Sequence, residues 1–358
     1  MRATGSAAQM ASVLQAAVAA GINHIETAPA YGPAESFLGL ALGDLRQQEP
    51  ELAADLVITS KLLPGLSLEE GQQQLRQILQ RLGLPRLHNL AVHGLNRAEH
   101  LEWALRGEGS TLLEWAQAEG LVGQVGFSSH GANVLIEEAL GSDRFQFCSL
   151  HLHWFDQERL PLARAALEAG MGVLAISPAD KGGRLYAPPQ VLIDDCAPFQ
   201  PLELAYRFLL DQGISTLSLG AAQASDLSLA AALSPSGGQW LSAAQRETLS
   251  RLSRHGAARL GAEACHQCRA CLPCPMEVPI PALLRLRNLD VGHGMRAFAQ
   301  ERYNLIGRAG HWWEQVNASA CARCGDCLPR CPHELPIPDL LEDTHGRLAA
   351  APRRRLWD

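Results

Sequence analysis

Two short runs of cysteines, about 56 residues apart, constrain this chain more than any other feature. The first is CHQCRACLPCP, from Cys265 to Pro275, and the second is CARCGDCLPRCP, from Cys321 to Pro332. Both continue into C-P-x-E-x-P-I-P-x-L-L, so they form an internal repeat. We expect each copy to be a cysteine loop followed by a helix, because the second proline of P-I-P suits the first turn of a helix.

The spacing of these cysteines predicts iron–sulfur clusters. The second run reads C-x2-C-x2-C-x3-C-P, the spacing of bacterial ferredoxins, and the first is one residue shorter before its last cysteine. In such runs three thiolates bind one cluster and the cysteine before proline binds the other. The predicted ligands of two 4Fe–4S clusters are Cys265, Cys268, Cys271 and Cys331 for one, and Cys321, Cys324, Cys327 and Cys274 for the other. Two structural zinc sites are the alternative, but zinc ligands usually come as two C-x2-C pairs.

Cysteine usage and charge narrow the class of protein. The chain has ten cysteines, and the two outside the runs, Cys148 and Cys196, are expected to be buried or inert. No signal-peptide pattern is visible, and no apolar run approaches the roughly 18 residues of a membrane helix. We therefore expect a cytoplasmic protein whose clustered thiols are metal ligands instead of disulfides. A net charge of −7 argues against nucleic acid as the main partner.

The residues before the cysteine runs alternate short apolar segments with amphipathic helical ones. Strands are predicted in NHIET, DLVITSK, HNLAVHG, QVGFSS, FQFCSL, GVLAIS and STLSLG. This alternation predicts an α/β fold with parallel pairing, and the length suits a (β/α)8 TIM barrel. A doubly wound sheet is the alternative, but no G-x-G-x-x-G follows an early strand. We expect a barrel domain over 1–245 and a mostly helical ferredoxin-like domain over 246–358.

Four side chains at the ends of three neighbouring predicted strands suit proton chemistry. Only two of the 30 basic residues are lysine, Lys61 and Lys181, so each is a candidate for work that needs a compact ammonium. Lys61 ends a predicted strand, and Glu26, Tyr31 and His93 lie at the ends of its two neighbours, so all four are expected at one rim. An ammonium makes a nearby phenol a better proton donor, and a carboxylate holds the ammonium in place. A histidine can orient a carbonyl oxygen. The set predicts proton delivery to a carbonyl that is being reduced.

Longer segments resemble a known family. GINHIETAPAYGPAESFLG, TSKLLP, LAVHGLN, VGFSSHG and ISPADKGGRLY are similar to successive signatures of the aldo/keto reductase family, over about residues 6–235. With its cysteine runs, the chain resembles the subgroup of predicted oxidoreductases that carry a C-terminal double 4Fe–4S ferredoxin-type domain. The resemblance places the family's catalytic Asp, Tyr, Lys and His on Glu26, Tyr31, Lys61 and His93. The aspartate is therefore a glutamate here.

The resemblance also implies where a nicotinamide would bind. Ser128 and Ser129 stand where the family has the Ser-Asn pair that holds the carboxamide, Ser149 replaces its glutamine, and Ile176 its stacking tyrosine. Ala222 and Gln223 stand where the family usually supplies Arg or Lys for the 2′-phosphate of NADPH. NADPH is therefore only weakly supported. The loop around Lys181 could wrap a pyrophosphate through its N–H groups or be a plain glycine-rich loop. The candidate cofactor-binding residues are Ser128, Ser129, Ser149, Ser177, Lys181 and Gly220.

Some features lie outside these patterns. The family normally has a strand before its first helix, whereas this chain begins MRATGSAAQ and enters a predicted helix directly. We expect either that Met1 is internal to a longer protein or that the barrel is open by one strand. His130 follows a strand end and could line the pocket. His151 and His153, two residues apart, are expected to pack rather than to bind metal.

Three functional interpretations remain. The leading one is an iron–sulfur oxidoreductase for a small carbonyl or alcohol, with electrons relayed through two clusters and exchanged with a ferredoxin- or flavodoxin-like carrier. The second is a catalytically degenerate barrel that acts as a ligand-binding redox sensor or electron relay. The third is an interaction protein stiffened by zinc.

Overall fold

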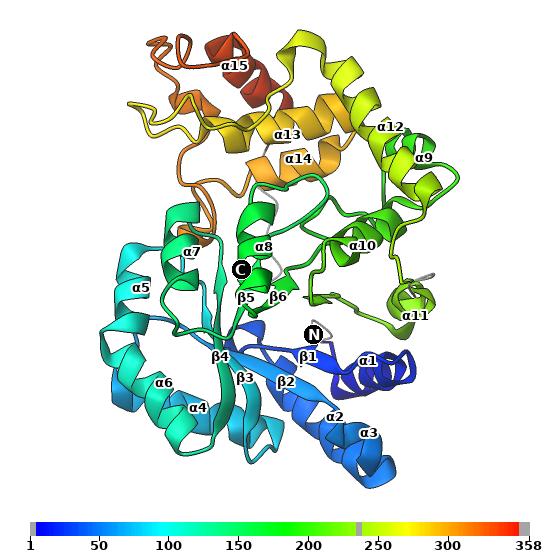
Figure 1. The fold of residues 1–358 in the computed structure, drawn as a ribbon, viewed down its shortest axis with the longest axis vertical. Helices are drawn as coiled ribbons and strands as arrows, with labels where there is room; N and C mark the ends of the chain where they lie inside the picture. Colours follow the sequence, from blue (N-terminus) through cyan, green and yellow to red (C-terminus); the bar gives the residue numbers. More distant parts are fainter. Residues whose placement is uncertain (1–4, 234–237, 351–358) are drawn as a thin grey trace. The chain divides into compact units, whose positions relative to one another are not determined.

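A computed structural model of the chain describes residues 5–233 and 238–350, which divide into two compact units (Figure 1). The first unit comprises Met1–Gly182 and Ala205–Trp240, and the second comprises Gly183–Leu204 and Leu241–Asp358. The short segment Gly183–Leu204 therefore belongs with the C-terminal part of the chain. The domain boundary at residue 245 stays a prediction, because compactness alone does not define a domain.

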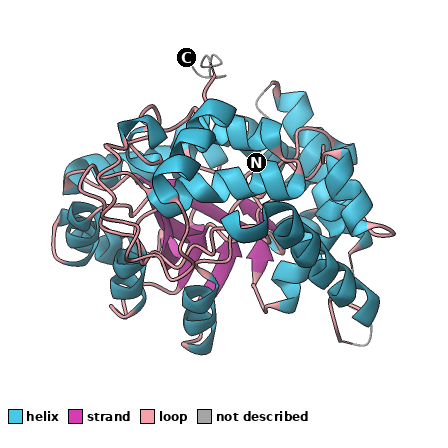
Figure 2. Ribbon diagram, turned by 90° about the horizontal axis from the view of Figure 1, so that it is seen from above, coloured by secondary structure: helices cyan, strands magenta, loops and turns pink. Residues whose placement is uncertain are grey.

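The first unit is built on one parallel sheet of seven strands in sequential order, and Figure 2 shows these strands as one group. The strands are β1 (His24–Glu26), β2 (Val57–Leu62), β3 (Leu87–His93), β4 (Val122–Ser129), β5 (Phe147–Leu150), β6 (Gly172–Ala175) and β7 (Thr216–Leu217). All seven predicted strands are present. Within the described residues β1 and β7 each pair with a single neighbour, so the sheet is open by one strand. The expected fold class is confirmed: this is the strand order of a (β/α)8 barrel.

Helices alternate with the strands of the first unit. They are α1 (Ala7–Ala19), α2 (Ala34–Gln48), α3 (Pro50–Ala54), α4 (Leu68–Leu82), α5 (Ala98–Leu105), α6 (Glu108–Ala118), α7 (Asn133–Leu140), α8 (Leu160–Glu168) and α11 (Ser228–Ala232). The boundary between the two units falls within α10 (Pro201–Asp211). The signals at the ends of α4 show why such helices form where they do. Ser67 and Glu70 form a capping box at its start, and Gly83 ends it with a left-handed φ of 62°.

Close approach of β4 and β5 requires a residue without a side chain. A Cβ atom on Gly126 would lie 2.4 Å from the Phe147 carbonyl oxygen, which no real side chain tolerates. The two strands then run in register from Gly126 opposite Phe147 to Ser129 opposite Leu150. This register fixes which residues leave the two strands side by side at the rim.

The opening of the sheet forms a recess. Residues of β1 and β7 line it together. Its polar side chains are those of His24, Glu26, Thr216 and Ser218, among apolar neighbours that include residues of α1 and β6. Glu26 thus lies both at the opening and beside the next strand, β2.

The second unit is helical. Its helices are α9 (Gln190–Cys196), α12 (Ala243–Leu260), α13 (Ile280–His293), α14 (Arg296–Tyr303) and α15 (Ile337–Leu348). Both helices of the repeat, α13 and α15, begin at the isoleucine of P-I-P and carry the following proline in their first turn, as predicted. α13 packs against α12, α14 and α15. The expectation of a mostly helical C-terminal part is confirmed.

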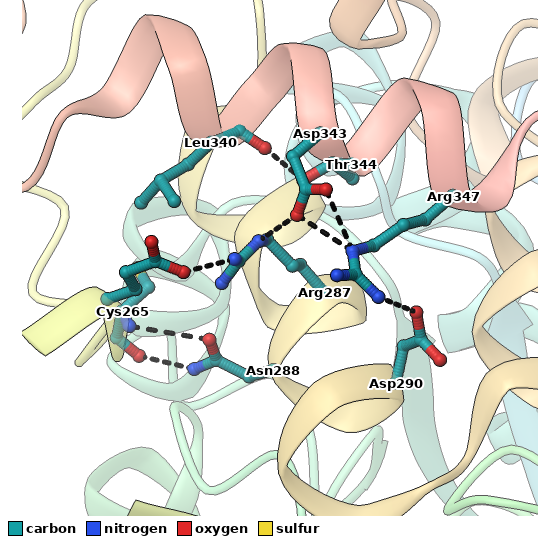
Figure 3. A network of polar contacts seen from close by, with 9 residues as sticks. Cys265, Arg287, Asn288, Asp290, Leu340, Asp343, Thr344 and Arg347 are labelled. Atoms are coloured by element: carbon teal, nitrogen blue, oxygen red, sulfur yellow. Dashed lines mark hydrogen bonds and ion pairs between the residues drawn. The ribbon is translucent and has the colours of Figure 1, made fainter. Parts of the chain in front are cut away.

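A polar network ties the first cysteine run to the two repeat helices (Figure 3). The Asn288 side chain, on α13, donates to the Cys265 carbonyl oxygen at 2.8 Å and accepts from the Cys265 N–H at 3.4 Å. The buried Arg287 guanidinium donates to Asp343 on α15 at 2.7 Å and also pairs with Glu263, just before the run. The start of the run is therefore fixed by side chains of α13.

No helix in 5–233 or 238–350 has both the length and the apolar character needed to cross a bilayer.

Candidate active site and cysteine sites

The ammonium of Lys61, on β2, is held by oxygen atoms from three other residues. Its Nζ lies 3.0 Å from Glu26 Oε1, at the end of β1. It donates to the Tyr31 hydroxyl oxygen at 3.1 Å and to the Thr27 carbonyl oxygen at 3.2 Å. The sequence predicted the first two partners; the third is a backbone group, which residue patterns do not reveal.

Burial and charge work against each other in this pair. Burial is the largest single influence and favours the neutral forms of both groups. The charge attraction and hydrogen bonds of Lys61 with Glu26 and Tyr31 together outweigh it, so the pKa of Lys61 is raised and the pKa of Glu26 is lowered. Lys61 is only 2 % exposed. The ammonium therefore stays charged beside the Tyr31 hydroxyl, although it lies out of water.

His93 completes the group at the end of β3. Its ring meets the Tyr31 ring edge-on, with centroids 5.9 Å apart and an interplanar angle of 89°. Lys61 Nζ lies 4.8 Å from the centroid of the same tyrosine ring. The structure thus brings together all four residues that the sequence placed at one rim.

The serines expected near a nicotinamide are bound to backbone groups instead. Ser128 Oγ accepts from the Gly94 N–H at 3.0 Å. Ser129 Oγ donates to the Leu95 carbonyl oxygen at 2.6 Å and accepts from the Gly131 N–H at 3.0 Å. Both hydroxyls therefore hold the loops that follow β3 and β4.

The remaining cofactor candidates are dispersed over the first unit. Ser149 is buried in β5. Ser177 has a left-handed φ of 47°, and its carbonyl oxygen accepts from the Lys181 N–H at 2.9 Å, so the two form one turn. Gly220 is exposed, with open space where a side chain would stand.

A carboxylate occupies the loop where the family usually has a cation for the 2′-phosphate. The Asp226 carboxylate accepts from the N–H groups of Ala222 at 2.9 Å and Gln223 at 3.1 Å. These hydrogen bonds lower the pKa of Asp226, so it is ionised at neutral pH. The loop presents a negative charge instead of a positive one.

Three histidines form a chain that the sequence did not predict. His151 Nε2 lies 3.2 Å from His130 Nε2, and His151 Nδ1 lies 3.2 Å from His153 Nε2. Burial lowers the pKa of His130 and His151 well below the usual value, and nearby cations add to the effect. This contact depends on the register of β4 and β5. Ser129 pairs with Leu150, so the next residues, His130 and His151, lie side by side.

The cysteines predicted to hold the second cluster line one recess in the second unit. Cys274 from the first run and Cys321, Cys324 and Cys327 from the second all face it. Arg330 also lines this recess, and its guanidinium donates to the Pro273 carbonyl oxygen at 2.9 Å, which ties one run to the other.

The cysteines predicted for the first cluster are also neighbours. His266, next to Cys265, stacks on His333, two residues after Cys331, with ring centroids 4.1 Å apart, so the end of the second run lies beside the start of the first. Burial raises the pKa of Cys265. Burial likewise raises the pKa of Cys271 to about 11. Four thiols from both runs at each site suit a cluster with four thiolate ligands.

The two isolated cysteines lie in apolar surroundings. Cys148 and Cys196 are buried, as expected, and burial raises the pKa of each to about 12. Both thiols are therefore protonated at neutral pH and unreactive.

Comparison with known proteins agrees with this architecture. Residues 3–187 match the model of the aldo/keto reductase family, which is more than half of the chain. The chain belongs to the aldo/keto reductase family. Membership implies oxidoreductase activity. Residues 264–335 match the model of the 4Fe–4S dicluster domain, so this family member carries an iron–sulfur domain after its barrel.

Solved structures show the same fold at low sequence identity. Aldo-keto reductase AKR11C1 from Bacillus halodurans in its holo form is 19 % identical, with a TM-score of 0.57 over 70 % of this chain and 88 % of that one. The aldose reductase from Schistosoma japonicum is 20 % identical, with a TM-score of 0.53 over 69 % of this chain and 84 % of that one. No curated protein matches the chain.

Proposed function

We propose that this protein reduces or oxidises a small carbonyl or alcohol substrate at the barrel rim and exchanges the electrons mainly through two 4Fe–4S clusters. The observation that carries the proposal is the contact of the Lys61 ammonium with both Glu26 and Tyr31, in a chain that also gathers four cysteines from two runs at one recess.

Tyr31 is the proton donor. In the direction of reduction its hydroxyl donates a proton to the carbonyl oxygen of the substrate. The Lys61 ammonium donates to the same tyrosine oxygen, so it stabilises the phenolate that remains. General acid catalysis of this kind contributes about 10²–10⁴-fold to the rate.

Glu26 and His93 position this donor. The glutamate is one methylene longer than the family's aspartate, yet its carboxylate reaches Lys61 at 3.0 Å and keeps the ammonium charged and directed at Tyr31. His93 stands against the edge of the tyrosine ring, where an imidazole can orient the substrate oxygen.

The cysteines supply two ligand sets. Cys265, Cys268, Cys271 and Cys331 would hold one cluster, and Cys274, Cys321, Cys324 and Cys327 the other. Bound clusters of this type transfer electrons one at a time. Gln267 and Arg269 in the first run and Arg323 in the second adopt left-handed backbone, which side chains other than glycine rarely do.

The residues present fit a phosphorylated nicotinamide poorly. The hydroxyls of Ser128 and Ser129 are already bound to backbone groups, and ionised Asp226 takes the N–H groups of the loop expected to meet the 2′-phosphate. A carboxylate there repels a phosphate. These observations favour a ferredoxin- or flavodoxin-like carrier over NADPH as the main electron source.

Anaerobic purification followed by iron, sulfide and bound-cofactor analysis tests the clusters, and turnover of a panel of carbonyls with a chemical reductant tests the barrel. We expect about eight iron atoms per chain, since each 4Fe–4S cluster holds four, and turnover that Tyr31→Phe lowers about 10²–10⁴-fold. Full iron with no turnover on any carbonyl would favour the redox sensor instead. A protein that holds zinc and no iron would favour the interaction protein.

A further inference from the structure

A buried carboxylate outside the active-site group joins three elements of the first unit. Glu35, in the first turn of α2, is only 1 % exposed. Its Oε1 accepts from the Ser60 hydroxyl of β2 at 2.6 Å. Its Oε2 accepts from Nε of Arg81, on α4, at 2.8 Å and lies 2.7 Å from Nη2 of the same guanidinium. This carboxylate is therefore well satisfied, although it lies almost completely out of water.

Glu35 and Ser60 lie next to two members of the active-site group. Ser60 directly precedes Lys61 in β2, and Glu35 follows Tyr31 by four residues. Side chains alternate along a strand, so Ser60 faces α2 while Lys61 faces the barrel rim. The Glu35–Ser60 bond and the Lys61–Tyr31 bond of 3.1 Å thus join the same two segments on opposite faces of β2.

The helix α4 holds Glu35 from its other side. A Cβ atom on Gly39, one turn after Glu35 in α2, would lie 1.9 Å from the Arg81 carbonyl oxygen, so the two helix backbones come very close together there. The Arg81 guanidinium that binds Glu35 therefore extends from a backbone packed directly against α2. Glu35 is thereby fixed between α4 and β2.

Stability alone does not account for a carboxylate at this position. Replacing a buried ion pair by apolar side chains of similar size is often neutral or stabilising. A carboxylate differs from an apolar side chain in that it accepts hydrogen bonds of fixed length and direction. One of these bonds fixes Ser60, the residue before Lys61.

We propose that Glu35 is a positioning residue: it holds Ser60, and through the backbone of β2 it keeps the Lys61 ammonium at bonding distance from the Tyr31 hydroxyl. This inference rests on the proposed function. Glu35 acts through Lys61 and not on the substrate. A displacement of about 1 Å can cost about 10²-fold in rate, so a β2 strand that is free to shift would slow proton donation by Tyr31.

Ser60→Ala tests the proposal, because it removes only the hydroxyl that Glu35 holds. Glu35→Leu, alone and combined with Ser60→Ala, shows whether both residues act through the same bond. Ser142→Ala is the matched control, since the Ser142 hydroxyl donates to the Ala139 carbonyl oxygen of α7 at 2.7 Å. We would measure kcat and KM with benzaldehyde as the probe and reduced methyl viologen as the electron source. Iron content and unfolding temperature are measured for every variant.

A second measurement does not depend on turnover. Lys61 and Lys181 are the only lysines of the chain, so oxidised protein labelled with carbon-13 at lysine Cε gives two sets of NMR signals. Lys61→Arg identifies the Lys61 set, and Lys181 is the internal reference.

We expect Ser60→Ala to lower kcat about 10–100-fold and to change KM less than about twofold. The combined variant should lose no more kcat than Glu35→Leu, because both changes break one bond. The Lys61 signals should move in Ser60→Ala and stay in place in Ser142→Ala, and the Lys181 signals should stay in place in both.

Wild-type kcat with unmoved Lys61 signals in Ser60→Ala would overturn the proposal, and so would a lower unfolding temperature as its only effect. Losses of kcat that multiply in the combined variant would also contradict it. If the wild type turns over no carbonyl, the proposed function fails, and the Lys61 signals alone decide whether Glu35 positions the ammonium.

Discussion

At the scale of single residues, Tyr31 and Lys61 carry the catalytic hypothesis. Tyr31→Phe keeps the ring against His93 but removes the proton donor, so we expect kcat to fall about 10²–10⁴-fold. Lys61→Arg should cost almost as much, because a planar guanidinium cannot replace a compact ammonium that meets three oxygen atoms within 3.2 Å.

Steady-state kinetics with a chemical reductant measure both losses. Tyr186→Phe, at a tyrosine that is 60 % exposed, is the matched control and should have wild-type kinetics. Unfolding temperatures of all three variants separate lost chemistry from lost fold. Wild-type kcat in both active-site variants would remove Tyr31 and Lys61 from the mechanism.

The buried histidines predict how stability responds to acid. The pKa values of His130 and His151 lie well below 6.5 in the folded chain, whereas unfolded imidazoles titrate near 6.5. Below about pH 6.5 the unfolded state therefore binds more protons, so the free energy of unfolding falls as pH falls, by up to about 1.4 kcal/mol per pH unit for each histidine.

Chemical denaturation at pH 7.5 and 5.5 measures this effect, with His151→Gln as the test variant. The variant lacks one of the buried imidazoles, so its stability should fall less between the two pH values than that of the wild type. His100, which is part-buried on α5 and lies outside the histidine chain, serves as the control through His100→Gln. An equal loss in all three proteins would contradict the assignment of the acid sensitivity to the histidine chain.

At the scale of elements, the cysteine loops predict crossed ligation. Cys274 lines the recess of the second run, and the stacked rings of His266 and His333 hold the stretch around Cys331 beside Cys265 of the first. Cys274→Ala should therefore damage the cluster held by Cys321, Cys324 and Cys327, and Cys331→Ala should damage the other. Residual iron and EPR of the reduced protein check this: each variant should keep one intact cluster signal, and the two signals should differ. Cys148→Ala is the control and should keep full iron. Full iron in both test variants would be incompatible with crossed ligation.

Two arginines that form ion pairs with α15 are expected to contribute differently to stability. Arg287 is buried and joins Glu263 to Asp343, whereas Arg323 is 53 % exposed and joins Asp339 to Glu342. We expect Arg287→Met to lower the free energy of unfolding by about 1–3 kcal/mol, because the carboxylates it leaves are partly hydrated. Arg323→Met should cost less than about 1 kcal/mol. Denaturant unfolding of the iron-loaded protein compares the two variants. An equal loss of unfolding free energy in both would show that burial of the Arg287 network adds nothing to stability.

The elements also show what the sequence could predict. Apolar β-rich segments were enough to find all seven strands, and parallel pairing then implied that Glu26, Lys61 and His93 share a rim. The chain His130–His151–His153 depends on the register of β4 and β5, which no local pattern specifies.

Contacts between residues far apart in the sequence also decide which segments belong to which unit. The segment Gly183–Leu204 joins the second unit partly because Asp195 is buried there and bonds to His255 at 2.7 Å and to Arg259 at 2.6 Å. These partners lie about 60 residues away along the chain. Nothing in the sequence around Asp195 reveals them.

At the scale of the whole molecule, a barrel of a family that transfers hydride, two electrons at a time, is joined to a domain of a type that transfers single electrons. A hydride from NADPH carries two electrons at once and requires no iron–sulfur cluster. A simple nicotinamide reductase would therefore gain little from residues 264–335. One-electron carriers, in contrast, suit the proposed function, in which the barrel supplies a proton donor and cysteines of the second unit hold clusters.

The last prediction follows from the contrast between hydride and one-electron transfer and from the carboxylate of Asp226. We expect titration calorimetry to find NADPH binding weaker than micromolar, since the phosphate would meet the ionised Asp226 carboxylate on the N–H groups of Ala222 and Gln223. Asp226→Asn removes that charge and should tighten NADPH binding more than NADH binding, because only NADPH carries the 2′-phosphate. Glu247→Asn, at an exposed carboxylate in the second unit, is the control. Micromolar or tighter binding in the wild type, together with NADPH-driven turnover that survives loss of the clusters, would show that the hydride route is primary.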